Sequence, residues 1–170
     1  MVPIEPLTVP TEADVDGLAA LLVDAVEDGA SVGFLLPLSR ADAAAWWREV
    51  LPDPLTETWV ARDDDGTVVG CVRLTRAWKP NSRHRGEISK LLVASRARRQ
   101  GLATRLMDTA ESAAWARGLR LLLLDTETDS PAQPFYSARG WTVVGVIEDY
   151  ASTPYGDPAP TTIMELRRRR

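Results

Sequence analysis

The stretch from Arg98 to Thr104 combines positive charge with small residues, as expected of a site for a negatively charged group. It contains the pattern Arg98-x-x-Gly101-x-Ala103 where the sequence predicts the first turn of a helix. A helix start leaves several backbone N–H groups without partners, and the helix dipole favours negative charge there. Gly101 and Ala103 have almost no side chain to keep a ligand away from those amides. We therefore interpret the stretch as a pyrophosphate cradle, against the alternative of a solvated surface helix.

Two carboxylates are candidates for acid–base chemistry. Glu87 lies on a predicted strand a few residues before the cradle, where a base could meet the reactive end of a bound molecule. Strand alternation places Leu91 on the face of Glu87, and Lys90 and Leu92 on the opposite face. Asp125 ends a predicted buried strand and so approaches the same crevice. A structural role in holding the next loop is the alternative for Asp125.

Periodicity and turn residues predict the elements that position these groups. Helices are expected over about 12–26, 39–50, 102–117 and 130–139, and strands over 4–9, 57–62, 67–78, 87–93, 120–126, 141–147 and 161–166. The apolar run 120–126 fits a strand covered on both faces. With strand 87–93 and helix 102–117 it forms a right-handed βαβ unit. The fold class is therefore α/β (α+β), with a mixed central sheet of about six to seven strands, flanking helices and a βαβ core that carries the cradle.

Two loops are expected near the ligand. The segment 28–34 has two glycines, small polar residues and one aromatic, and it can lie close to a ligand, although a plain connector has the same composition. The segment 148–160 is rich in Pro, Gly and Asp and is predicted to be a loop beside the site. Ser130 is predicted to cap the short helix that follows the buried strand, with Pro131 as its first residue.

Composition narrows the classes of partner. A chain of 170 residues predicts one domain, 1–170, with 167–170 as a frayed tail. The net charge of -4 argues against nucleic acid, despite the run of arginines at 167–170. One cysteine, Cys71, and one histidine, His84, exclude a Cys-based zinc site within the chain, and we expect no metal. Without a signal-like N-terminus or an apolar window of ~20 residues, we expect a cytoplasmic protein with no membrane segment.

Two motifs resemble those of one superfamily. The cradle is similar to the (Arg/Gln)-x-x-Gly-x-(Gly/Ala) signature of the GNAT N-acetyltransferases, which holds the pyrophosphate of acetyl-CoA. The segment from Phe135 to Trp141 resembles their Phe-Tyr-x-x-x-Gly-(Phe/Trp) pattern and follows the cradle by one strand and one loop, as in that superfamily. The resemblance implies a single GNAT domain with acetyl-CoA as cosubstrate. The implied cofactor contacts are Leu91, Leu92, Val93, Arg98, Arg99, Gln100, Gly101, Leu102, Ala103, Thr104, Phe135 and Tyr136.

The resemblance also implies roles in a direct transfer to an amine. Glu87 is assigned as the base, directly or through a water, with Asp125 as helper or alternative. Tyr136 would donate a proton or hydrogen bond to the leaving thiolate, whereas simple packing with its hydroxyl bonded to backbone is the alternative. A backbone N–H of the 92–93 segment would stabilise the oxyanion. Acceptor contacts are assigned to Ser31, Val32, Gly33, Phe34, Glu87 and Tyr150.

Further stretches resemble the tabtoxin-resistance acetyltransferases, among them 29–34, 79–81 and 124–127. This similarity implies a small, amino-acid-like amine as acceptor, such as an antibiotic or toxin. Protein or peptide amines are an alternative class of acceptor, and a non-catalytic CoA-binding sensor is an alternative to an enzyme. We expect a small-molecule partner, with neither nucleic acid nor membrane, and a homodimer is left open.

Overall fold

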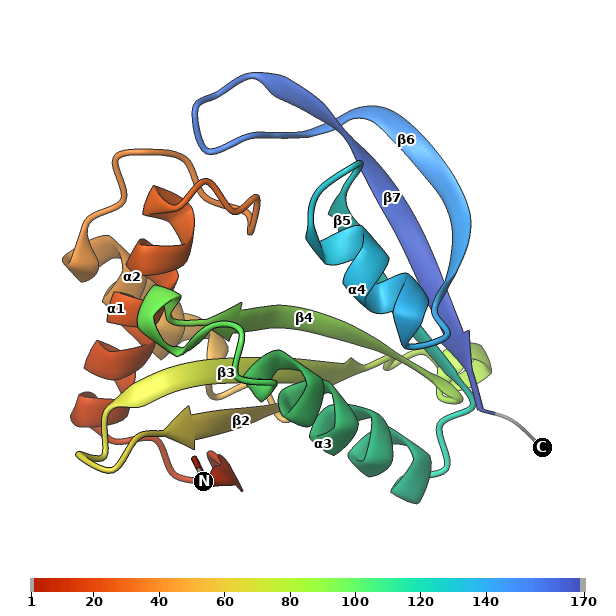
Figure 1. Ribbon diagram of the computed structural model, residues 1–170. Helices are drawn as coiled ribbons and strands as arrows, with labels where there is room; N and C mark the ends of the chain where they lie inside the picture. Colours follow the sequence, from red (N-terminus) through yellow and green to blue (C-terminus); the bar gives the residue numbers. More distant parts are fainter. Residues whose placement is uncertain (1, 169–170) are drawn as a thin grey trace.

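The structure is a computed structural model that describes residues 2–168. Within this range seven strands form one mixed sheet, and α-helices cover both of its faces (Figure 1). The strand order is β1-β2-β3-β4-β5-β7-β6. The strands are β1 (Ile4–Pro6), β2 (Thr56–Arg62), β3 (Val68–Arg76), β4 (Arg85–Val93), β5 (Leu121–Glu127), β6 (Thr142–Ser152) and β7 (Pro158–Arg167). The helices are α1 (Glu12–Glu27), α2 (Arg40–Val50), α3 (Leu102–Ala116) and α4 (Ala132–Ala138), with short 3₁₀ turns η1 (Pro80–Ser82) and η2 (Ser95–Ala97).

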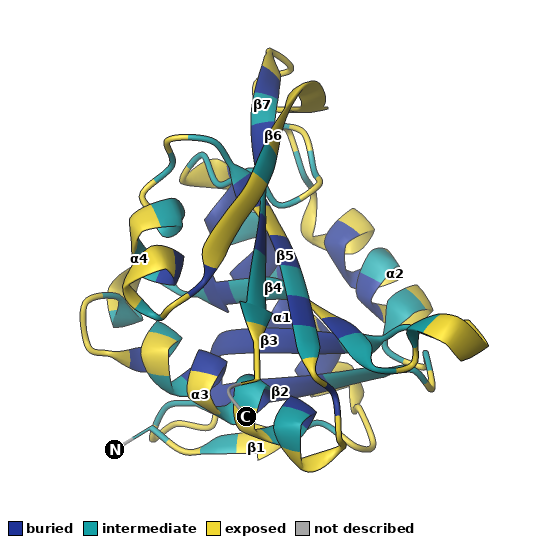
Figure 2. Ribbon diagram, turned by 90° about the vertical axis from the view of Figure 1, so that its right-hand side faces the viewer, coloured by how far each residue is buried: buried dark blue, intermediate teal, exposed yellow. Residues whose placement is uncertain are grey.

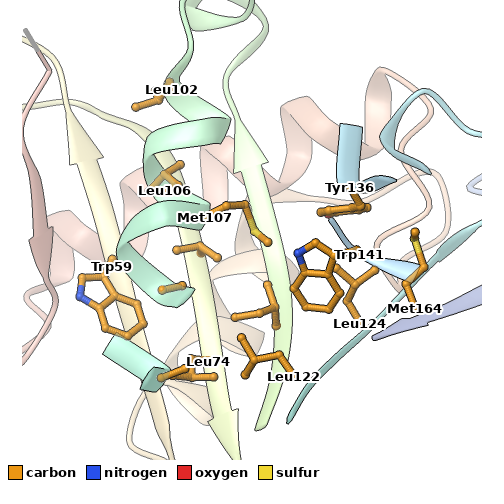
Figure 3. Packing of buried hydrophobic residues seen from close by; sticks show 14 of the residues in the cluster. Trp59, Leu74, Leu102, Leu106, Met107, Leu122, Leu124, Tyr136, Trp141 and Met164 are labelled. Carbon is orange, nitrogen blue, oxygen red and sulfur yellow. The ribbon is translucent and has the colours of Figure 1, made fainter. Parts of the chain in front are cut away.

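Two hydrophobic cores lie on opposite faces of the sheet. Helices α1 and α2 bury one face, with Leu18, Leu22 and Trp47 fully enclosed. Helices α3 and α4 cover the other face, where the core includes Leu106 and Met107 (Figure 3). The predicted caps hold the first two helices: Thr11 forms a capping box with Asp14, and Ser39 accepts from the Asp42 N–H. The sheet is therefore held between two helical layers, with α1 and α2 on one face and α3 and α4 on the other.

The predicted βαβ unit is confirmed by β4, α3 and β5. Strands β4 and β5 pair in parallel only through residues 85–87 and 121–123. Beyond these rungs the two strands separate, as Figure 1 shows. The backbone of β4 after Glu87 therefore has a partner strand on one side only, namely β3.

A bulge in β4 corrects the predicted alternation. The register with β3 shifts between Cys71 and Arg73, so that Lys90 and Leu91 together oppose a single residue of β3. Lys90 takes a φ of +50°, which absorbs the extra residue. Beyond the bulge the faces exchange: Leu92 is buried in the core under α1 and α2, whereas Leu91 packs against the core under α3. The alternation prediction for Leu91 and Leu92 was wrong because an inserted residue reverses every later side chain.

The predicted loop 148–160 is also wrong over most of its length. Strand β6 continues to Ser152 and β7 begins at Pro158, so only 153–157 form the turn. The register shifts between Ile147 and Ala151, and Asp149 has a φ of +50°, so the strand bends within this stretch. Strand β6 is the sheet edge and is exposed along almost its whole length (Figure 2). An edge hairpin tolerates the Pro and Gly residues that favoured a loop in the sequence.

Smaller differences concern element ends. Strand β1 stops at Pro6 rather than at residue 9. Helix α4 begins at Ala132 with Pro131 as its N-cap and without a side-chain cap, so the predicted capping by Ser130 was wrong. Arg167 ends β7 and the Arg168 N–H donates to the Arg120 carbonyl at 3.2 Å, so these two residues do not belong to a frayed tail. Residues 169–170 of the predicted tail lie outside the described residues.

Candidate active site

A cavity of about 1050 Å³ lies where β4 and β5 separate. Its walls come from the loop after α1, the bulged half of β4, the start of α3, the end of β5, α4 and the β6–β7 hairpin. Most of the residues assigned from sequence line it, namely Ser31, Val32, Gly33, Leu91, Leu92, Val93, Arg98, Arg99, Gly101, Leu102, Ala103, Thr104, Asp125, Phe135, Tyr136 and Tyr150. Three assigned residues do not: Phe34, Glu87 and Gln100. The chain thus brings cradle, carboxylate and tyrosine to one cavity.

The cradle presents a run of free backbone donors. The N–H groups of Ala94, Ser95 and Ala97 already donate within the protein. From Arg99 to Thr104, no N–H has an acceptor among residues 2–168. Gly101 is the N-cap of α3 with a φ of +74°, and a Cβ placed on it would meet nothing within 4 Å. These amides and the open space before them fit a pyrophosphate, as the sequence pattern predicts.

The basic side chains around the cradle divide between holding the loop and facing the cavity. Arg98 pairs with the Asp28 carboxylate, and its Nε donates to the Val93 carbonyl at 3.2 Å. Arg96 pairs with Asp63 at 2.8 Å. Arg99 lines the cavity and forms no ion pair with any described carboxylate. Arg98 therefore fixes the loop, and Arg99 is the arginine best placed to meet an anion.

Gln100 does not line the main cavity. It lines a separate, smaller cavity together with Asp63 and Arg105. Its N–H has no acceptor among residues 2–168, so a cofactor contact of Gln100 stays a prediction for its backbone. The motif could not reveal this, because it specifies a spacing and not the direction of each side chain.

One backbone donor of β4 points toward the cavity. The Ala94 N–H donates to the Val69 carbonyl at 2.9 Å, and Val93 opposes Gly70. Hydrogen-bonded and non-bonded positions alternate along an antiparallel pair, so Val93 occupies a non-bonded position and its N–H points away from β3. Strand β5 has already diverged at this level. The Val93 N–H is therefore free to stabilise a developing negative charge.

The two carboxylates occupy one face of the sheet. Glu87 pairs with Leu123 across the parallel strands, and Asp125 lies two residues further along β5, so both point to the side covered by α1 and α2. Partial desolvation, followed by the nearby Asp125 charge, raises the pKa of Glu87, while Arg85 and Lys90 oppose this shift. Asp125 lines the cavity, whereas Glu87 is exposed and lies outside the lining. The pair can hold and pass on a proton.

Tyr136 joins the cavity from α4. The centroid of its ring lies 5.3 Å from that of Phe135 and 6.2 Å from that of Trp141. Figure 3 shows Tyr136 beside Trp141. Desolvation, and then the Asp125 charge, raises the pKa of Tyr136 to about 12. No group among residues 2–168 forms a hydrogen bond with its hydroxyl, so the alternative of a backbone-bonded tyrosine is not what the structure shows. The phenol is protonated at neutral pH and available to a ligand.

Sequence reasoning missed a lysine in the cavity wall. The ammonium of Lys90 lies 5.1 Å from the Trp46 ring and 5.9 Å from the Phe34 ring, and the lysine lines the cavity. Phe34, assigned to acceptor binding, therefore stands behind Lys90 rather than in the lining. One feature of the sequence could have drawn attention to Lys90: only two lysines, at 79 and 90, occur among 20 basic residues.

The β6–β7 hairpin lines the acceptor end of the cavity. The Leu36 N–H donates to the Pro154 carbonyl at 2.8 Å, which joins the hairpin turn to the loop after α1 (Figure 1). Tyr150 and Ala151 of the hairpin line the cavity. The predicted proximity of 148–160 to the site is thus confirmed, although most of the segment is strand.

Between residues 2 and 168, no three His, Cys, Asp or Glu side chains gather in a way that could hold a metal ion. In the same part of the chain, none of the helices has the length and apolar character to cross a membrane.

Comparisons with known proteins agree with this geometry. The profile of the acetyltransferase (GNAT) family matches residues 29–141. A protein of Azospirillum brasilense, described as an uncharacterized N-acetyltransferase in the hisH-hisA intergenic region, is 32% identical over 130 residues, which cover 75% of this chain and 77% of that protein.

Solved structures show the same fold. A ribosomal-protein-alanine N-acetyltransferase of Brucella melitensis superposes with a TM-score of 0.79 at 23% identity, covering 98% of this chain and 99% of that one. A GNAT superfamily phosphinothricin acetyltransferase of Sinorhizobium meliloti, in complex with AcCoA, gives a TM-score of 0.79 at 18% identity, covering 98% and 88%. From the family profile and the sequence relative, this chain belongs to the GNAT family of N-acetyltransferases, which are acyltransferases.

Proposed function

We propose that this protein transfers the acetyl group of acetyl-CoA directly to the amine of a small, amino-acid-like molecule. The observation that carries the proposal is the meeting of three groups in one cavity: the free amides from Arg99 to Thr104, the carboxylate of Asp125 and the hydroxyl of Tyr136. Family membership supports the acetyl transfer, and the shape of the acceptor end supports a small acceptor.

Acetyl-CoA fits the cradle on physical grounds. Six consecutive residues, 99–104, offer N–H groups with no acceptor among the described residues, and the dipole of α3 adds to their field. Gly101 leaves the approach open, and Arg99 adds a cation at the rim. When bound, acetyl-CoA supplies the thioester whose acetyl carbon the amine attacks. The S. meliloti neighbour, which is bound to AcCoA, supports this cosubstrate.

The acceptor must lose a proton before it can react. An alkylamine of the lysine type has a pKa of about 10.4, so it is protonated near pH 7. Asp125 in the cavity and the nearby Glu87 are the groups that can take this proton, Glu87 through a water or through Asp125. The raised pKa of Glu87 brings it closer to neutral pH, which suits a base.

Tyr136 stabilises the leaving sulfur by a hydrogen bond. Its pKa of about 12 makes it a weaker acid than a thiol, whose pKa is ~8.5. Complete proton transfer from the phenol to the thiolate would thus be uphill by ~5 kcal/mol. Tyr136 therefore donates a hydrogen bond to the thiolate without giving up its proton, while the Val93 N–H stabilises the oxyanion. Both donors are fixed before the reaction begins, so they need no reorganisation. The thiolate is protonated by the second proton, which the nitrogen releases as the amide forms, directly or through water.

The walls of the acceptor end favour a small molecule. The loop after α1 and the β6–β7 hairpin both line this end, and the Leu36–Pro154 hydrogen bond ties the loop to the hairpin turn. The similarity to the tabtoxin-resistance acetyltransferases and the phosphinothricin acetyltransferase neighbour point to the same acceptor class. A protein N-terminus is the second candidate acceptor, because the B. melitensis neighbour is named a ribosomal-protein-alanine N-acetyltransferase.

An acetyl-transfer screen tests the proposal. The enzyme is incubated with acetyl-CoA and a panel of small amines, including amino-acid-like antibiotics, and with peptides that carry a free N-terminus; mass spectrometry identifies the acetylated product. We expect a small amine to be acetylated faster than any peptide. Acetylation of peptides alone would show that the acceptor is a peptide or protein amine and not a small molecule. Binding of acetyl-CoA without transfer to any amine would indicate a sensor.

A further inference from the structure

The acceptor end of the cavity contains a cation that the chain itself does not neutralise. Lys90 lines the cavity, and its ammonium lies 3.9 Å from the position that a Cβ on Gly33 would take. No carboxylate among residues 2–168 forms an ion pair with it. Lys90 is half-buried, and a cation that has lost part of its water usually has an anionic partner, because leaving water is costly for an ion.

The lysine reaches this place through the bulge in β4. In a regular strand Lys90 would point away from the face of Glu87, toward α3. The extra residue and the φ of +50° turn its side chain to the face of Glu87 instead, against the rings of Phe34 and Trp46. The Cys71 thiol donates to the Lys90 carbonyl at 3.3 Å and so helps to hold this conformation.

The aromatic rings compensate the lysine only in part. Cation–π contacts are weak relative to the loss of hydration of a buried ammonium. Arg73, which lies on the same face and also packs against Trp46, adds like charge. Desolvation, and then Arg73, lowers the pKa of Lys90, while Asp125 and Glu87 oppose the shift from a greater distance than an ion pair. This wall of the cavity therefore has a positive potential.

We propose that Lys90 binds a carboxylate of the acceptor, so that the enzyme selects amines that carry an anionic group close to the reacting nitrogen. The inference rests on the proposed function and narrows its acceptor class. Asp125 and Glu87 attract the ammonium end of such a molecule, and Lys90 attracts the carboxylate end. An amino acid presents these two charges together, whereas the N-terminus of a peptide has a neutral amide in place of the carboxylate.

The test compares matched acceptors and matched variants. The acceptors are the common L-amino acids and their carboxamides, which differ only in the negative charge. The variants are Lys90→Met, which removes the charge at similar length, and Lys90→Arg, which keeps it. Lys79→Met is the control, because Lys79 lies 5.7 Å from the Trp78 ring outside the cavity lining. The readouts are kcat/KM, thermal melting, and calorimetric binding of the same amino acids to the CoA-loaded enzyme.

We expect Lys90→Met to lower kcat/KM for the preferred amino acid by roughly 10- to 100-fold, mainly through KM, because a hydrogen-bonded charge pair is lost. Its activity on the carboxamide should change less than about threefold. Lys90→Arg should restore part of the preference, and Lys79→Met should match the parent enzyme. An equal loss on both acceptors would overturn the proposal, since a structural role predicts that result.

The proposed function can fail separately from this inference. If no amine is acetylated but amino acids bind the parent enzyme and not Lys90→Met, the anion site stands and the transferase assignment falls. If uncharged amines are acetylated as well as amino acids, the transferase assignment stands and the role of Lys90 is refuted. Absence of amino-acid binding to the parent enzyme refutes it too.

Discussion

Replacing Tyr136 by Phe removes one hydroxyl and leaves the ring in place. That hydroxyl has no hydrogen-bond partner among the described residues, and the ring keeps its contacts with Phe135 and Trp141. The free energy of unfolding should therefore change by less than about 0.5 kcal/mol. A hydrogen bond to a charged group is worth about 1.5–3 kcal/mol, so losing the one to the thiolate should lower kcat by roughly 10- to 150-fold.

The assay follows release of the CoA thiol with a chromogenic thiol reagent. Cys71 is the only cysteine and is buried, with a pKa raised to about 12 by desolvation, so the protein itself should react little. Calorimetry should show an acetyl-CoA affinity within about twofold of the parent. Tyr155→Phe is the matched control, because Tyr155 is exposed and lies outside the cavity lining. An unchanged kcat would remove Tyr136 from the mechanism, and a lower melting temperature would reassign it to structure.

Three further outcomes follow from the same geometry. Gly101→Glu should weaken acetyl-CoA binding more than about 100-fold by calorimetry, because it places a negative charge among the amides; Gly66→Glu has a similar φ and equally open space in the β2–β3 turn, and should bind normally. A base works only when it is ionised, and the pKa of Glu87 is raised. The plot of kcat/KM against pH should therefore fall on its acidic side at a pH above the pKa of an ordinary glutamate, and Glu87→Gln should abolish this acidic fall. An identical pH profile in the variant would exclude Glu87 as the base. Arg139→Met leaves the largely buried Glu111 without its cation, which should cost about 2 kcal/mol and lower the melting temperature by roughly 4–8 °C, whereas an unchanged melt would contradict the importance of this pair.

The sequence was informative where one physical requirement dominates a segment. The start of α3 needs free amides and a left-handed residue, and Gly101 reveals both. Helix α3 itself was predicted to within one residue because its apolar period is regular. The prediction of the site failed at Lys90, whose side chain was assigned to the wrong face of the sheet. A single-residue bulge leaves no trace in composition, and yet it decides where the side chain points.

The β6–β7 hairpin escaped prediction for a different reason. Residues such as Pro158 and Pro160 indicate a loop by their local preference, but both lie within β7, in an exposed two-stranded extension that accepts them. The contact between Leu36 and Pro154 joins segments far apart in the chain, so no local pattern records it. The joining of these two walls at the acceptor end, on which the choice of a small acceptor depends, is therefore visible only in the fold.

The free N–H groups at the start of α3 also make the melting temperature depend on how much acetyl-CoA is bound. A ligand that binds only the native chain, present at a hundred times its dissociation constant, adds about 2.7 kcal/mol to the free energy of unfolding. For a domain of this size that corresponds to a melting temperature higher by roughly 5–10 °C. The lifetime of this protein against proteases would then rise and fall with the coenzyme A supply.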